Sequence, residues 1–281
     1  MSPADRREKK SRLRQYLRRK RAILLAFSGG KDSFFLLREA TLALGEANVF
    51  AYFVRTPFTG EAALERVAYF RSKFPFPLRE IRIDLLADAR LRSNPRQRCF
   101  YCKQRMFTTL KKEARRLGIE TVADGTTVSD QQLYRPGRRA LDKLAVWSPL
   151  KDAGFEGSEI VAELKALGID EYHLTSSTCL ATRFPYDVPL TADRVAAIGQ
   201  VEHFLIGKGI HPLRVRFIPD GVRIETPPAN FKKTIALKKE LQEFCQARGF
   251  TFVTLDLGGM RSGPWDEPPA AAVPVPGVSS D

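Results

Sequence analysis

One glycine-containing run has the composition of an anion-binding loop: Ser28-Gly29-Gly30-Lys31-Asp32-Ser33. It follows an apolar stretch and precedes apolar residues at helical spacing. In such a strand-to-helix turn, glycines let backbone N–H groups approach an oxyanion, and the helix N-terminus adds partial positive charge. Lys31 adds a mobile cation, the serine hydroxyls can donate to phosphate oxygens, and Asp32 fits if it holds the loop or positions Mg²⁺. The pattern predicts a nucleotide site rather than an ordinary tight turn. It is not the common P-loop, because Gly-x-x-x-x-Gly-Lys-Ser/Thr is absent.

The four cysteines are the second set of residues that can do chemistry. Without an export signal they are not expected to form a disulfide framework. Cys99 and Cys102 form a Cys-x-x-Cys pair directly before a helix expected to begin at Lys103, where the helix dipole favours a thiolate. Cys179 lies among serines and threonines, which suits a reactive or ligating sulfur. Cys245 falls on the apolar face of a helix and is expected to be a small buried residue.

Three of these thiols define a candidate metal site made of Cys99, Cys102 and Cys179. Three thiolates can hold three irons of a [4Fe–4S] cluster and leave the fourth iron open. A structural zinc site would need a fourth ligand, and the only histidines are His173, His203 and His211. A redox Cys-x-x-Cys would need no third cysteine. The pattern favours cluster or sulfur-transfer chemistry over these two alternatives.

The elements that must position these residues alternate along the chain. Apolar strand candidates are residues 22–27, 49–54, 78–83 and 119–123, and helix candidates are residues 33–44, 60–73, 103–117, 137–145, 157–167 and 191–208. Continuous apolar strands between helices predict a parallel sheet covered on both faces, in an α/β fold. Ligands of such sheets bind at the carboxyl ends of the strands. The glycine-containing loop, Arg55-Thr56 and Asp124-Gly125-Thr126 are therefore expected along one edge.

The pattern changes after about Pro189. A hairpin with an Asp-Gly turn is predicted over residues 213–225, then a helix near 230–248 and a strand over 250–257. We therefore expect a basic N-terminal arm (1–21), a nucleotide-binding domain (22–189), a smaller C-terminal α+β domain (190–263) and a disordered Pro/Ala-rich tail (264–281).

The net charge is +14, and much of the basic excess lies in residues 1–21. That charge suits either nucleic acid or a phosphorylated small molecule, and the arm is alternatively a solvated, partly helical segment. No apolar stretch is long enough to span a bilayer, and the N-terminus lacks the apolar core of a secretory signal. We expect a cytoplasmic protein without a membrane partner.

Several ordered motifs resemble one family as a set. Besides the glycine-containing loop they are Arg98-Cys-Phe-Tyr-Cys-Lys103, Asp124-Gly-Thr126, Tyr134-Arg-Pro-Gly-Arg-Arg-Ala140, Ser148-Pro-Leu150, Cys179-Leu-Ala-Thr-Arg-Phe-Pro-Tyr186, Arg214-Val-Arg216, Arg223-Ile-Glu225 and Asp256-Leu-Gly-Gly-Met-Arg-Ser-Gly263. From about Ala22 to Gly263 the chain resembles the LarE-type ATP-dependent sacrificial sulfur transferases of the ATP pyrophosphatase (PP-loop) superfamily. The resemblance implies an adenine nucleotide alpha hydrolase-like PP-loop domain, ATP and Mg²⁺.

The resemblance also implies a reaction. The family adenylates a carboxylate of pyridinium-3,5-biscarboxylic acid mononucleotide, releases pyrophosphate and forms a thiocarboxylate of the nickel-pincer nucleotide cofactor of lactate racemase. In one-cysteine members the cysteine that matches Cys179 gives up its sulfur and becomes dehydroalanine. Members that also have the cysteines matching Cys99 and Cys102 are thought to carry a [4Fe–4S] cluster that delivers sulfide. The resemblance further implies a homo-oligomer and a sulfide or cysteine-derived sulfur donor.

Site residues follow from the matched motifs. ATP-binding residues are Ser28, Gly29, Gly30, Lys31, Asp32, Ser33 and Gly125; catalytic candidates are Cys179, Arg183, Glu202 and Glu225; substrate- or phosphate-binding candidates are Arg214, Arg216 and Arg261. A guanidinium fork suits phosphate and carboxylate, and Arg183 can lower the pKa of the nearby Cys179 thiol. The alternative for Arg214, Arg216, Arg223 and Glu225 is the exposed face of an alternating hairpin.

The chain departs from the family at Thr127 and Ser129, where the family tends to have Asn and Asp. Loss of the Asn amide and of one carboxylate would change how the nucleotide or Mg²⁺ is held. A paralogue that acts on another carboxylate therefore remains an alternative. A tRNA-thiolating enzyme of the same superfamily is a second hypothesis, supported by the basic arm; tight RNA binding with a steep salt dependence would favour it. A non-enzymatic nucleotide-binding protein whose cysteines hold zinc is a third.

Overall fold

The computed structural model describes residues 3–132, 136–175 and 178–260. Its first sheet has four strands in the order β3-β2-β1-β4, and every neighbouring pair is parallel. The strands are β1 (Ile23–Ala26), β2 (Val49–Arg55), β3 (Leu78–Arg82) and β4 (Thr121–Ala123). Ile23 is in register with Val49 on one side and with Thr121 on the other. The predicted parallel α/β sheet is confirmed.

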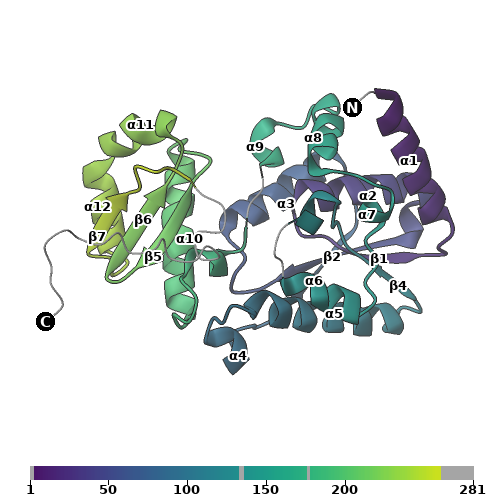
Figure 1. Ribbon diagram of the computed structural model, residues 1–281, viewed down its shortest axis with the longest axis horizontal. Coiled ribbons are helices and arrows are strands. Elements are labelled where there is room, and N and C mark those ends of the chain that lie inside the picture. Colours follow the sequence, from purple (N-terminus) through teal and green to yellow (C-terminus); the bar gives the residue numbers. More distant parts are fainter. Residues whose placement is uncertain (1–2, 133–135, 176–177, 261–281) are drawn as a thin grey trace, which may run out of the picture.

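Helices cover both faces of this sheet (Figure 1). One face carries α1 (Pro3–Arg18), α2 (Lys31–Leu44), α3 (Glu61–Lys73), α7 (Pro149–Asp152) and α8 (Gly157–Ala166), and the other carries α5 (Arg98–Arg116) and α6 (Pro136–Lys143). Alternate residues of β1 serve the two layers, because Ile23 and Leu25 join one core cluster and Leu24 the other. The short helices α4 (Ala89–Arg92) and α9 (Glu171–Leu174) lie beside these layers.

The basic N-terminal segment forms part of the helical layer on one face of the first sheet. Leu13 and Leu17 of α1 are fully buried in the same cluster as α2 and α8. Lys9 Nζ lies 2.9 Å from Glu159 Oε1 in α8, and Arg14 Nε lies 2.7 Å from Glu39 Oε2 in α2. Residues 3–18 therefore form a docked helix and not the solvated arm that charge alone suggested.

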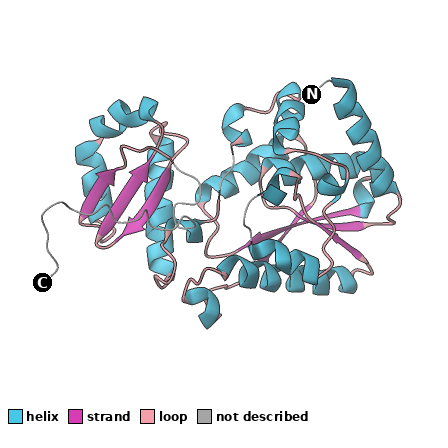
Figure 2. Cartoon of the chain, viewed as in Figure 1, coloured by secondary structure: helices cyan, strands magenta, loops and turns pink. Residues whose placement is uncertain are grey.

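A second, three-stranded sheet follows, with strands β5 (Arg214–Ile218), β6 (Gly221–Glu225) and β7 (Phe252–Leu255) in that order. Figure 2 shows it apart from the first sheet, accompanied by helices of its own. β5 and β6 are antiparallel, whereas β6 and β7 are parallel. The hairpin turn is made by Pro219 and Asp220, because Gly221 already pairs with Ile218, one residue earlier than the expected Asp-Gly turn.

The helices of this second part are α10 (Ala192–Gly207), α11 (Phe231–Ala236) and α12 (Lys238–Gln246). The single helix expected near 230–248 is divided at Leu237 and is preceded by a 3-10 turn, Pro228–Asn230. Three further 3-10 turns are Glu46–Asn48, Ser129–Gln132 and Leu180–Arg183, the last labelled η3. α10 connects the two parts, because it contacts α3, η3 and β5. Among the described residues, no helix is long and apolar enough to cross a membrane.

Candidate functional site

Residues 28–33, called the phosphate loop after the role expected from the sequence, lie at the carboxyl end of β1 and run into α2, which begins at Lys31. Gly29 has a φ of 74°, and a Cβ added there would lie 2.8 Å from Val67 Cγ2, so the backbone conformation and the close approach both require glycine. The two serines close the loop, with 3.1 Å between their Oγ atoms, and Ser33 Oγ donates to Gly30 O at 2.9 Å. The backbone turn expected for a phosphate site is present.

Lys31 is held by its neighbour in this loop. Its Nζ lies 2.8 Å from Oδ1 and 2.9 Å from Oδ2 of Asp32. The aspartate in this loop thus holds the lysine side chain in place. Behind the loop, the buried Arg66 of α3 donates from Nε to Gly29 O at 3.3 Å. Burial lowers the pKa of Arg66 below its ordinary value. Sequence reasoning missed Arg66, because a charged residue in a predicted surface helix carries no signal of burial.

The loop after β4 touches the phosphate loop, as the parallel sheet predicts. A Cβ added to Gly125 would lie 2.8 Å from the backbone N of Ser33, so only glycine allows this approach. The preceding Asp124 is buried and accepts hydrogen bonds from Ser148 Oγ at 2.7 Å and Thr126 Oγ1 at 2.6 Å. These bonds fix the backbone of the loop at the point of contact.

The two departures from the family pattern both make local hydrogen bonds. Thr127 is buried and donates from N and Oγ1 to Asp130 Oδ2, at 2.9 and 3.0 Å. Ser129 Oγ accepts from the N–H of Gly157, the first residue of α8, at 3.1 Å. Thr127 and Ser129 thus fasten the loop that follows Gly125 and connect it to α8.

Cys99 and Cys102 are the second and fifth residues of α5, which begins at Arg98 and not at Lys103 as expected. Both side chains are half-buried. Burial raises the pKa of both thiols, and the charge of Cys179 raises it further, whereas Arg98 and Lys103 act in the opposite direction. The expectation that the helix start favours a thiolate is therefore wrong for the chain alone, because desolvation outweighs the neighbouring positive charge.

Cys179 is exposed and stands directly before η3. Its effect on the pKa of Cys99 and Cys102 places it within electrostatic reach of the cysteine pair. In the part of the chain that the structure describes, no three His, Cys, Asp or Glu residues are grouped closely enough to hold one metal ion. The donor set consists of thiols alone, which suits an iron–sulfur cluster, whose several irons need ligands more widely spaced than those of a single ion. Cys245 is fully buried, as predicted.

Arg183 and Glu202 form a buried bidentate pair beside Cys179. Arg183 Nε lies 2.6 Å from Glu202 Oε1, and its Nη2 lies 3.1 Å from Oε2. Glu202, in α10, also accepts the backbone N–H of Val215 at 2.9 Å. Arg183 Nη1 donates to Thr178 Oγ1, next to Cys179. The pair therefore joins the Cys179 segment to α10 and to the edge of β5.

A second charged cluster fills the polar face of the β5–β6 hairpin. Arg216 donates from Nε to Glu225 Oε2 at 3.0 Å and from Nη1 to Thr182 O at 2.7 Å, and Arg223 Nη2 donates to Glu225 Oε1 at 3.0 Å. Burial lowers the pKa of Arg216 to about 10 and also lowers that of the half-buried Arg214. Arg216 and Glu225 are both buried, so the exposed-hairpin alternative is wrong for these two residues. Arg261 lies outside the described residues.

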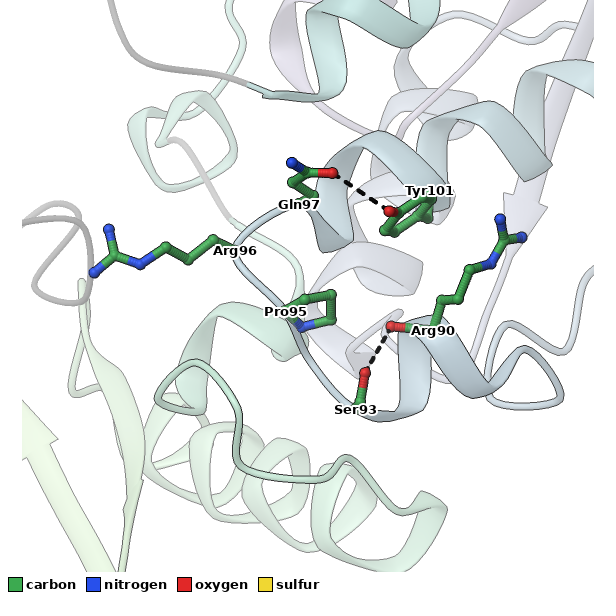
Figure 3. A pocket seen from close by; sticks show the side chains of 6 residues that line it. All are labelled: Arg90, Ser93, Pro95, Arg96, Gln97 and Tyr101. Atoms are coloured by element: carbon green, nitrogen blue, oxygen red, sulfur yellow. Dashed lines mark hydrogen bonds between the residues drawn. The ribbon is translucent and has the colours of Figure 1, made fainter.

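An open pocket of about 360 Å³ lies at the junction of α4 and α5, next to the cysteine pair (Figure 3). Tyr101 OH donates to Gln97 Oε1 at 3.3 Å in its wall, and Arg96 extends away from Arg90. The remaining lining residues are Ser93 and Pro95. The sequence alone did not predict this pocket, because its lining residues have the composition of an ordinary polar loop before a helix.

A parallel α/β sheet with a glycine-containing turn at the carboxyl end of its first strand is the arrangement of a Rossmann-like domain. No family model matches the chain. It is 31% identical over 255 residues to pyridinium-3,5-bisthiocarboxylic acid mononucleotide synthase of Lactiplantibacillus plantarum, covering 91% of this chain and 92% of that protein. The chain belongs to the LarE family of enzymes, to which that synthase belongs.

Two uncharacterized proteins have similar coverage. One, from Synechocystis, is 31% identical over 89% of this chain and 94% of its own length. The other, from Methanocaldococcus jannaschii, is 29% identical over 90% of this chain and 96% of its own length. The similarity extends over both sheets in each case.

Proposed function

We propose that this protein is an ATP-dependent sulfur transferase acting on pyridinium-3,5-biscarboxylic acid mononucleotide. It would adenylate a carboxylate in a PP-loop domain and convert it to a thiocarboxylate for the nickel-pincer nucleotide cofactor. The Lactiplantibacillus plantarum relative, named for synthesis of the bisthiocarboxylic product, supports this substrate. The observation that carries the proposal is the exposed Cys179 beside the buried Arg183–Glu202 pair and within electrostatic reach of Cys99 and Cys102.

In the first step, a carboxylate oxygen attacks the α-phosphorus of ATP, the bond to the β-phosphate oxygen breaks, and pyrophosphate leaves. The backbone N–H groups of the phosphate loop and the start of α2 would hold the departing phosphates. Lys31 would exchange Asp32 for a phosphate oxygen, which frees the Asp32 carboxylate to help position Mg²⁺. The carboxylate is thereby activated, because AMP is a far better leaving group than an oxide.

In the second step, a sulfur nucleophile attacks the carbonyl carbon of the acyl-adenylate, a C–S bond forms, and the C–O bond to AMP breaks. If the Cys179 thiolate attacks, loss of its Cα proton and cleavage of the Cβ–Sγ bond leave dehydroalanine and release the thiocarboxylate. Arg183 lies within electrostatic reach of that sulfur.

Cys99, Cys102 and Cys179 would hold a [4Fe–4S] cluster, which when bound supplies sulfide at the iron that lacks a protein ligand. On that route Cys179 is a ligand and is not consumed. The all-thiol donor set, which comes from the start of α5 and the residue before η3, supports the cluster form of the family.

Substrate anions would bind near β5. Arg214 is half-buried at the start of this strand; burial and the charge of Arg183 lower its pKa, Glu225 and Glu202 oppose them, and a substrate anion would further favour its charged form. Arg216 is already paired with Glu225. We therefore assign Arg216 two roles: it keeps the charged side chains of the hairpin in place, and it attracts the substrate phosphate. Glu202 accordingly orients Arg183, and Glu225 orients Arg216. Arg261 remains a proposed contact of the substrate phosphate. We also propose a homo-oligomer in the cytoplasm.

The test is an anaerobic reaction of the iron–sulfide-reconstituted protein with Mg-ATP, sulfide and the pyridinium dicarboxylate mononucleotide, followed by mass spectrometry. Substitution of carboxylate oxygen by sulfur together with AMP formation is expected. Cys179→Ala should abolish the product, whereas Cys245→Ala, which removes a buried thiol far from the proposed chemistry, should keep it. Dehydroalanine at position 179 would assign the sacrificial route, and repeated turnover with intact Cys179 the cluster route. ATP binding without any sulfur-containing product would contradict the substrate assignment.

A further inference from the structure

Arg98 carries a buried donor that the rest of the described chain does not satisfy. Its side chain is 5% exposed, and its Nε has no hydrogen-bond partner among the described residues. Its Nη1, by contrast, donates to Asn94 Oδ1 at 2.7 Å. Leaving a buried N–H without an acceptor destabilises the fold, and more so when the group is charged, so such a group calls for a specific explanation.

The unsatisfied donor lies beside the cysteine pair. Arg98 is the first residue of α5 and directly precedes Cys99. It is therefore the immediate sequence neighbour of one proposed cluster ligand, and its buried guanidinium belongs to the same helix start as the cysteine pair.

Arg98 also contacts the segment that follows Cys179. Its guanidinium carbon lies 4.6 Å from the centre of the Tyr186 ring, in a cation–π arrangement. Asn94, which accepts from Arg98, donates from Nδ2 to Pro185 O at 2.7 Å and accepts the N–H of Asp187 on its carbonyl at 3.0 Å. One buried arginine is thus joined to both stretches of chain that supply the three thiols.

We infer that Arg98 is a positioning residue that holds the Cys99–Cys102 turn against the Cys179 segment and donates its Nε–H to a sulfur atom of the cluster bound there. The inference rests on the cluster form of the proposed function. Hydrogen bonds to cluster sulfurs set the reduction potential of iron–sulfur centres. A buried donor that also carries a full positive charge stabilises the added electron, so it raises that potential.

The experiment compares wild type with Arg98→Lys, Arg98→Gln and the control Arg96→Gln after anaerobic reconstitution with iron and sulfide. Arg96 is exposed and lies over the same Tyr186 ring at 5.6 Å, so it matches Arg98 in charge and neighbourhood but not in burial. The readouts are iron and sulfide per chain and the midpoint potential from an electron paramagnetic resonance titration. We expect a more negative potential in Arg98→Gln, a smaller shift in Arg98→Lys and none in Arg96→Gln. Unchanged potential and iron content in both Arg98 variants would overturn the inference.

A second measurement can overturn the inference on the wild-type protein alone. Wild-type protein labelled with nitrogen-15 arginine and reduced with dithionite should give a nitrogen hyperfine coupling in electron–nuclear double resonance, and Arg98→Lys should lose it. A reduced cluster with no arginine coupling overturns the inference even if both Arg98 variants fail to fold. Wild-type protein that takes up no iron and sulfide contradicts the proposed cluster itself, which separates that failure from the failure of the role of Arg98.

Discussion

Arg216 Nε and Glu225 Oε2 lie 3.0 Å apart across the β5–β6 hairpin, and both side chains are almost fully withdrawn from water. The same carboxylate accepts from Arg223 through its other oxygen at 3.0 Å. One carboxylate therefore neutralises two arginines in a place where an unpaired charge is expensive.

Removing that carboxylate should destabilise the fold. Glu225→Ala leaves Arg216 buried without its partner, and we expect a loss of about 3–5 kcal/mol in the free energy of unfolding. Urea denaturation followed by circular dichroism measures it. Arg82→Ala, which removes an exposed arginine on β3, should change stability by no more than about 0.5 kcal/mol. Equal effects of the two variants would mean that the buried cluster contributes nothing specific.

The contact between the phosphate loop and the loop after β4 gives a second prediction. Gly125→Ala would place a Cβ 2.8 Å from the backbone N of Ser33, so the start of α2 must move. We expect weaker ATP binding in isothermal titration calorimetry. Gly207→Ala is the matched control, because a Cβ there meets nothing within 4 Å, and ATP affinity should stay as in wild type. Unchanged ATP affinity in Gly125→Ala would separate this loop contact from nucleotide binding.

The docked N-terminal helix gives a third prediction. Leu17 of α1 is fully buried in the core cluster that it shares with α2 and α8, so Leu17→Ala should cost about 2–5 kcal/mol in the free energy of unfolding. Leu42→Ala, at a leucine of α2 that is 50% exposed, should cost far less. Chemical denaturation of both variants decides it. A Leu17→Ala protein as stable as Leu42→Ala would contradict a structural role for residues 3–18.

His173 predicts how stability depends on pH. Its ring stacks on Tyr69 with 3.5 Å between centroids, and its Nδ1 has no hydrogen-bond partner among the described residues. Burial lowers its pKa below the ordinary value of 6.5, Arg66 and Lys73 lower it further, and Asp170 opposes them. The unfolded chain thus binds a proton more readily than the folded one, so this residue destabilises the fold as the pH falls below 6.5.

The urea midpoint of wild type should accordingly decrease as the pH is lowered through 6.5. His173→Phe keeps an aromatic ring on Tyr69 without a titrating group, and it should show a shallower decrease. Parallel pH profiles for the two proteins would assign the acid sensitivity to other residues.

Much of the first sheet follows from the sequence, because buried parallel strands are continuous apolar runs and the glycine turn marks where β1 ends. The start of α5 was missed by several residues, because Gln97 provides no side-chain cap and Pro95 reads as loop. The burial of Arg216 and Glu225 could not be predicted from the local sequence, because an alternating strand pattern places charged residues on the solvent side. Arg216 is buried against Thr182, which lies in a segment remote in the sequence.

The place of α1 in the chain has a consequence for biosynthesis. Lys9 and Lys10 of α1 leave the ribosome about 150 residues before their carboxylate partners Glu159 and Glu163 in α8. α2, with Glu39 as the partner of Arg14, follows soon after α1, but until α8 has emerged Lys9 and Lys10 lack their carboxylate partners beside an anionic RNA machine. The nascent chain therefore completes this layer late, when α8 joins α1.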